Sequence, residues 1–163
     1  MPLEGMDRKK YLEIKFSGEE NAKKNYQLIY KAGLQNNLYF QFDKILLTPN
    51  SFASHKLLAL AYKANKQTAV LETLFYNYFI EGINIGSLKE LIRIAKHHKI
   101  YNKNTLEYLK SDKDNKNLLE EENHARELGI NGVPCFIINK KYVLFGAQNN
   151  DKFKEIFNYI INE

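Results

Sequence analysis

The pattern of hydrophobic and polar positions predicts α-helices through the middle of the chain. Apolar residues recur at helical spacing along residues 51–64, and again after Lys66. The second stretch has the wider apolar face, made of Val70, Leu71, Leu74, Phe75, Tyr78 and Phe79. Aromatic residues at this spacing are most often core, so we expect these side chains to be buried rather than to line a cofactor pocket.

Polar residues at helix starts divide the helical region further. Asp7 is placed to cap a helix that runs to about Phe16. A serine followed at the third position by an acidic residue is typical of a capping box. We expect such boxes to open helices at residues 17–20, 87–90 and 111–114. The first of these helices is predicted to end near Gly33 and the last at Gly129.

Two short segments have weaker patterns. Residues 38–42 alternate too weakly to distinguish a short strand from an extended loop. Thr48-Pro49-Asn50-Ser51 is typical of a turn that leads into a helix. No strand is predicted before these segments.

The last third of the sequence changes to a strand pattern and then back to a helix. Two apolar runs, Cys135 to Ile138 and Tyr142 to Phe145, flank a polar turn at residues 139–141, which predicts a β-hairpin. An amphipathic helix follows, with apolar positions at Phe153, Ile156, Phe157, Ile160 and Ile161. The chain is therefore predicted to end in a β-β-α unit over residues 132–163.

Length and composition favour one globular domain over residues 1–163. The chain is 44% hydrophobic, and no Gly-, Ser- or Pro-rich linker divides it. Within that domain we expect a mainly helical subdomain at 7–129. The start of the sequence lacks the pattern of a signal peptide, and no apolar run is long enough to span a bilayer, so we expect a cytoplasmic protein that does not insert into membranes.

The basic charge is weak evidence for a nucleic-acid partner. The net charge is +5, but the lysines are spread among acidic residues, and Arg8, Arg93 and Arg126 are the only arginines. Heavy use of Lys, Asn and Ile is a bias that AT-rich codons would produce. We therefore expect no nucleic-acid partner.

Several motifs resemble the DsbA-like family of disulfide oxidoreductases, and in particular its FrnE-like branch. The run from Gly132 to Ile138, with Gly146-Ala147-Gln148 after it, is similar to the proline strand of that family and its sequel. Residues 4–8, 48–51, 55–57 and 78–82 resemble further stretches of the family. The resemblance covers essentially the whole chain. It implies an α/β thioredoxin-like fold with a large helical insertion and a C-terminal β-β-α unit.

The sequence departs from this family at its beginning. Family members open with a strand, a Cys-x-x-Cys helix and a second strand, whereas this sequence opens near the equivalent of their next segment and contains one cysteine, Cys135. Exchange chemistry needs an attacking thiolate and a second, resolving thiol. We therefore expect a thiol-disulfide oxidoreductase family member that lacks the N-terminal β-α-β unit. It would be truncated and inactive alone without an upstream Cys-x-x-Cys segment.

The best candidate site is the loop Val133-Pro134-Cys135. The resemblance implies a cis Val133–Pro134 bond and a loop that binds an extended peptide or glutathione. A thiol on an apolar strand, with no basic neighbour in sequence, is interpreted first as a small, inert hydrophobe.

A second candidate region is the helical cleft that the family implies. Asn50 and His55 are placed to meet a substrate there, although a capping or surface role explains them equally well. Adjacent His97 and His98 point to different sides of a helix, and no further ligand has metal-site spacing, so we expect no metal. No cofactor is expected other than glutathione.

Other functions remain open from the sequence. The resemblance extends to glutathione-dependent isomerases of 2-hydroxychromene-2-carboxylate and to kappa-class glutathione transferases. A non-catalytic peptide-binding module is the third alternative. Expected partners are a thiol or disulfide-containing peptide or glutathione, an upstream fragment, or a second copy paired through the Cys135 to Ile138 edge.

Overall fold

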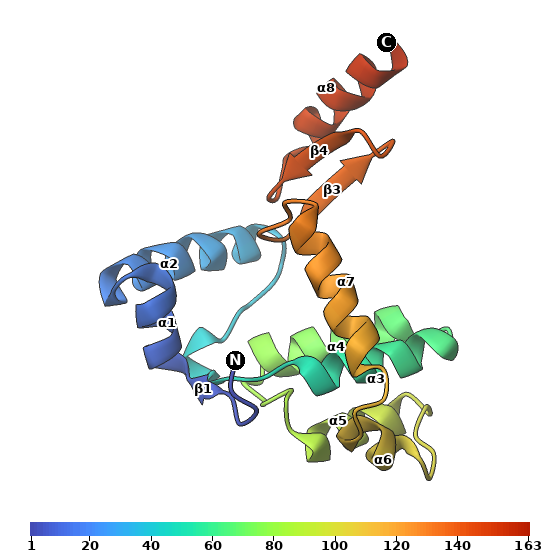
Figure 1. Ribbon diagram of the computed structural model, residues 1–163. Helices are drawn as coiled ribbons and strands as arrows, with labels where there is room; N and C mark the ends of the chain where they lie inside the picture. The colour runs from blue at the N-terminus through green and yellow to red at the C-terminus, as the bar shows by residue number, and fades with distance from the viewer. The chain divides into compact units, whose positions relative to one another are not determined.

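The computed structural model describes all residues, 1–163 (Figure 1). The chain folds as two compact units. The first unit is Met1–Asp114 and the second is Asn115–Glu163. Each unit is described by itself. The boundary falls before the last predicted helix of the helical subdomain, so that helix groups with the hairpin. The single domain and the 7–129 and 132–163 divisions stay predictions.

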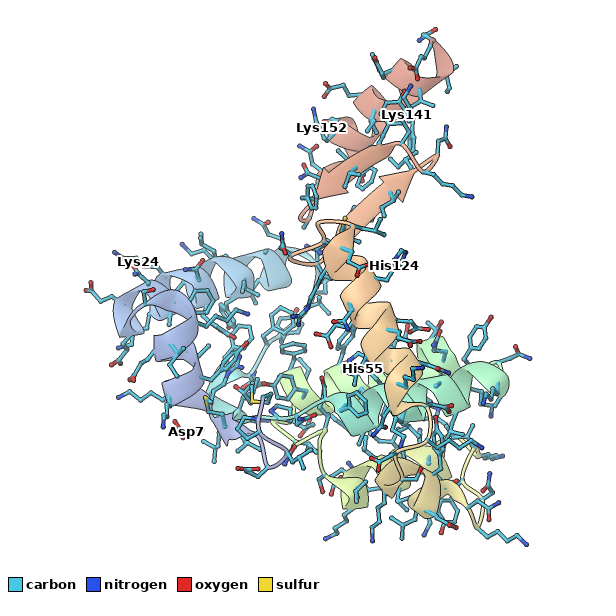
Figure 2. All side chains as sticks on the ribbon, in the orientation of Figure 1. Asp7, Lys24, His55, His124, Lys141 and Lys152 are labelled. Carbon is cyan, nitrogen blue, oxygen red and sulfur yellow. The ribbon has the colours of Figure 1, made fainter.

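The first unit begins with a short strand and two helices. Strand β1 (Met6–Asp7) leads into α1 (Arg8–Phe16), and α2 (Glu19–Gln35) lies beside α1 (Figure 1). As predicted, Asp7 caps α1, and its Oδ1 accepts a hydrogen bond of 2.9 Å from the Lys10 N–H. Asp7 lies where β1 meets α1 (Figure 2).

Strand β1 pairs antiparallel with β2 (Leu47–Thr48), which the sequence did not predict. Met6 is opposite Thr48, and Asp7 is opposite Leu47. Gly5 permits this close approach, because a Cβ on Gly5 would lie 2.7 Å from the Thr48 carbonyl oxygen. The pairing fixes the start of the chain next to the segment that precedes the central helices.

The predicted capping boxes are wrong in their geometry, although helices begin close to the expected positions. Ser17 adopts a left-handed conformation, so Gly18 takes the cap position of α2 without a side-chain hydrogen bond. Ser87 is the cap of α5 but also makes no side-chain cap bond. Ser111 ends a helix rather than starting one. Its hydroxyl donates to the Tyr108 carbonyl at 2.8 Å.

Residues 36–51 cross to the central helices mostly without regular structure. Residues 38–41 are an extended loop, which settles the open alternative, and a 3-10 turn (η1, Phe42–Lys44) follows. The Gln41 N–H donates to the Phe79 carbonyl at 2.8 Å. The predicted turn at residues 48–51 does lead into a helix.

The core of the first unit lies among four helices. These are α3 (Phe52–Lys63), α4 (Gln67–Phe79), α5 (Leu88–His97) and α6 (Thr105–Lys110). Residues that pack the core are Leu57, Ala61, Val70, Leu74, Leu91, Ile94, Ala95 and Leu109. Tyr78 is buried as expected, but Phe75 is 53% exposed, so the apolar face of α4 is narrower than predicted. Helix α6 was not predicted.

The second unit contains α7 (Asn115–Glu127), β3 (Cys135–Ile138), β4 (Tyr142–Phe145) and α8 (Asn150–Ile161). The predicted hairpin and terminal helix are present (Figure 1). Asn139 and Lys140 both have positive φ, which suits a tight hairpin turn. Leu144 is the only residue of this unit that is buried. The unit therefore has little hydrophobic core of its own.

Candidate functional site

The candidate loop stands directly before β3 and is open to solvent. Val133 is 90% exposed, and no backbone hydrogen bond within the protein involves it. The Val133–Pro134 peptide bond is cis. The Pro134 carbonyl accepts a hydrogen bond of 2.8 Å from the Gly146 N–H, which joins the loop to the end of β4. The loop is thus held at one end and free at the other.

Strand β3 is an edge strand whose two faces differ. It pairs only with β4, with Ile137 opposite Val143. On one face Phe136 contacts Phe153 of α8, with ring centroids 4.9 Å apart. On the other face Ile137 and Val143 are 48% and 44% exposed. An edge strand beside an uncovered apolar face can accept another strand.

Cys135 begins β3 and is half-buried with a free thiol. It is the only cysteine in the sequence, so this chain cannot form an internal disulfide. Side chains alternate along a strand, which places Cys135 on the same face as Ile137. That face carries the uncovered apolar side chains described above. The thiol therefore lies among apolar neighbours rather than at a helix start.

Asn50 and His55 lie in the first unit, whereas the loop at residues 133–135 lies in the second. The Asn50 side chain is occupied, because its Oδ1 accepts from the Phe52 N–H at 2.9 Å and its Nδ2 donates to the Met1 carbonyl at 3.1 Å. Asn50 therefore acts as a turn residue before α3. His55 lies on α3 and is exposed (Figure 2).

A cluster that the sequence did not indicate surrounds Arg8. Its Nη1 donates to the hydroxyls of Thr48 at 2.9 Å and Tyr78 at 3.1 Å, and its Nη2 donates to the Tyr26 hydroxyl. The guanidinium carbon lies 5.3 Å from the Tyr26 ring centroid and 5.8 Å from that of Tyr11. Burial raises the pKa of Tyr78, while the charge of Arg8 acts in the opposite direction. The cluster joins α1, α2, β2 and α4.

A second unexpected cluster surrounds Lys56 on α3. Lys56 is 1% exposed, and its ammonium donates to the Ser111 carbonyl at 2.5 Å. The Tyr108 hydroxyl donates to Asp114 Oδ2 at 2.8 Å. Burial lowers the pKa of Lys56, against the opposing charges of Asp114 and Asp112. Burial and the hydrogen bond to Asp114 raise the pKa of Tyr108 to about 12.

Of the adjacent histidines His97 and His98, His98 is hydrogen-bonded to the neighbouring helix α4. His98 Nε2 lies 2.8 Å from the Thr73 hydroxyl, and that hydroxyl donates to the Ala69 carbonyl at 3.0 Å. The His98 nitrogen is therefore the donor to Thr73. Burial is the main cause that lowers the pKa of His98, with His97 and Lys66 adding to it.

No helix of the chain is both long and apolar enough to cross a membrane.

Comparison with known proteins agrees with this architecture. Residues 4–158 match the family described as the DSBA-like thioredoxin domain. No curated protein matches the sequence significantly. The chain is similar to the crystal structure of a probable DsbA oxidoreductase from Streptomyces coelicolor, with a TM-score of 0.82 and 19% identity over 97% of this chain and 68% of that chain.

The predicted α/β thioredoxin-like fold with a helical insertion is confirmed by these two findings. The structural likeness, at its low identity, concerns the fold alone. The family match covers nearly the entire sequence. The chain therefore belongs to the DSBA-like thioredoxin domain family.

Proposed function

We propose that this chain provides the substrate-binding part of a thiol-disulfide oxidoreductase of the FrnE-like branch, and that it has no dithiol-exchange activity alone. One observation carries the proposal. Val133 is exposed, makes no backbone hydrogen bond within the protein and stands shortly before β3, whose outer edge has no partner strand. An open loop that continues into an open strand edge is suited to pairing with an extended peptide.

The chemistry of exchange supports the absence of activity in this chain alone. A thiolate attacks a disulfide, and a second thiol then releases the mixed disulfide. The sequence supplies one thiol, Cys135, on a half-buried strand position. A segment with a Cys-x-x-Cys motif would supply both thiols. The same β3 edge and its uncovered face would seat such a segment, or a second copy of this chain.

Three ligands fit this edge in our proposal. They are a peptide that contains a cysteine or disulfide, glutathione, and the Cys-x-x-Cys segment itself. Each presents backbone amide groups to the loop, and the first two place a sulfur near Val133. We propose no cofactor beyond glutathione.

The proposal is tested by the dithiothreitol-driven reduction of insulin, followed by turbidity. The 163-residue chain alone is expected to leave the rate at the level of buffer, as is its Cys135→Ser variant. A Cys-x-x-Cys segment from a family member, added in trans, is expected to reduce insulin faster with the chain than without it. Acceleration by the chain alone that disappears in Cys135→Ser would contradict inactivity. No gain on adding the segment would contradict the complementation.

A further inference from the structure

A groove in the first unit lies apart from the candidate loop. It has a volume of about 420 Å³ and lies between α1, α2 and residues 42–46. Its apolar lining is formed by Leu12, Ala22, Tyr26, Phe42, Ile45 and Leu46. The rings of Tyr26 and Phe42 meet edge to face with centroids 4.6 Å apart. This size and lining are within the range of small-molecule sites.

Arg8 lines the groove, and some of its guanidinium N–H groups make no hydrogen bond within the protein. Its Nη1 uses both hydrogens on Thr48 and Tyr78, and its Nη2 uses one on Tyr26. The Nε–H and the second Nη2–H make no hydrogen bond within the protein, and guanidinium N–H groups bind carboxylates strongly. No carboxylate forms an ion pair with Arg8.

The other charges of the groove are partly matched. Lys9 and Lys23 both pair with Glu19, at 3.7 Å and 2.8 Å. Asp7, Glu13 and Asp43 also line the groove, and none of them forms an ion pair, although Asp7 accepts the Lys10 N–H as the cap of α1. A simple anion would be attracted by Arg8 but repelled by these carboxylates. A molecule with both charges would pair its anionic group with Arg8 and its cationic group with Glu13 and Asp43, while Asp7 is occupied as a helix cap.

We propose that this groove binds a small zwitterion with an aromatic body, of the chemical class of free aromatic amino acids. The ligand carboxylate pairs with Arg8, and its ammonium faces Glu13 and Asp43. The ligand ring packs against Tyr26 and Phe42, two aromatic residues that both line the groove. This proposal is independent of the proposed exchange function.

The test compares matched probes on the unmodified 163-residue chain. L-phenylalanine, 3-phenylpropionate (no ammonium) and phenethylamine (no carboxylate) are titrated while backbone amide signals are recorded by NMR. L-phenylalanine is expected to shift the amides of Arg8, Tyr26 and Phe42, and each single-charge probe is expected to bind at least several-fold more weakly. No shift with L-phenylalanine, or equal binding of either single-charge probe, would overturn the proposal.

A variant extends the test without disturbing the Arg8 cluster. Glu13 and Asp43 are exposed, so the double change Glu13→Gln and Asp43→Asn is compatible with folding. It is expected to weaken L-phenylalanine binding about tenfold and to leave 3-phenylpropionate binding unchanged or stronger. Glu20→Gln is the control, because Glu20 is an exposed residue of α2 outside the groove lining. Equal affinity in the double variant and the control would refute the assigned ammonium site.

Discussion

The ammonium of Lys56 lies over the ring of Tyr108, 4.8 Å from its centroid. Lys56 also donates a hydrogen bond to the Ser111 carbonyl, and the Tyr108 hydroxyl donates one to Asp114. Together these contacts fix the last segment of the first unit to α3. A buried ammonium is costly to desolvate unless hydrogen bonds and a cation–π contact offset that cost.

Replacement of Lys56 by alanine is expected to destabilise the first unit by about 2–4 kcal/mol. The change removes a fully buried side chain and leaves the Ser111 carbonyl without its donor. Urea unfolding followed by circular dichroism measures the effect. Lys63→Ala, at an exposed position of α3, is the control and should change stability by less than about 0.5 kcal/mol. Similar values for the two variants would contradict the buried role.

Because of Tyr108, we expect the stability of the first unit to fall at alkaline pH. The pKa of Tyr108 is raised from 10.0 to about 12 in the folded chain, so the phenol ionises first in the unfolded chain. The contribution of Tyr108 to the free energy of unfolding is therefore complete below pH 10. It falls by on the order of 2 kcal/mol as the pH rises to about 12. The lowered pKa of Lys56 acts with the opposite sign.

A comparison with Tyr108→Phe separates the tyrosine from other groups. The variant is expected to be less stable than the wild type near neutral pH by about 1 kcal/mol, because Asp114 loses its donor. The difference should shrink as pH rises above 10.0, where the wild-type phenol is penalised. A difference that stays constant with pH would show that Tyr108 ionises alike in both states.

Because of His98, we expect the first unit to lose stability on acidification. The pKa of His98 is lowered from 6.5 by burial, so the unfolded chain takes up the proton first as pH falls. Stability is then expected to fall below pH 6.5, through the lowered folded pKa. The slope should become shallower in His98→Asn and persist in His55→Asn, since His55 is exposed. Equal slopes in both variants would show that His98 is not responsible.

The uncovered edge of β3 predicts self-association. Ile137→Lys introduces a charge on the exposed apolar face and should reduce association, measured by sedimentation velocity across a concentration series. Ile161→Lys is the matched control, because Ile161 is 79% exposed at the end of α8. A wild-type chain that stays monomeric at every concentration would rule out pairing through this edge.

The parts of the fold that local patterns predict are the long helices and the hairpin. Helical spacing of apolar residues identifies α3 and α4, and the polar turn at residues 139–141 identifies the hairpin between β3 and β4. Strands β1 and β2 have two residues each, too few for an alternation to be visible. Ser17 shows that a capping pattern does not ensure a cap, because its left-handed backbone passes the position to Gly18.

The candidate sites also differ in how far the sequence alone indicated them. The loop at Val133 was indicated by a motif resemblance. The Arg8 cluster was not, because its partners Thr48 and Tyr78 are 40 and 70 positions away in sequence. Two features of the sequence mark Arg8: arginine is scarce in this lysine-rich chain, and residues 4–8 resemble a stretch of the family. Lys56 also lies in a stretch that resembles the family, but its spacing on α3 does not distinguish a buried lysine from a surface one.

Binding of an extended peptide to the loop and the β3 edge is the central claim. It is tested most directly by NMR titration of the full chain with a short extended peptide that carries serine in place of cysteine, which prevents covalent capture. We expect shifts at the amides of Val133, Cys135 and Ile137, with slower hydrogen exchange along β3 as new strand pairing forms. Shifts confined to residues 1–114, or no shifts at all, would contradict it.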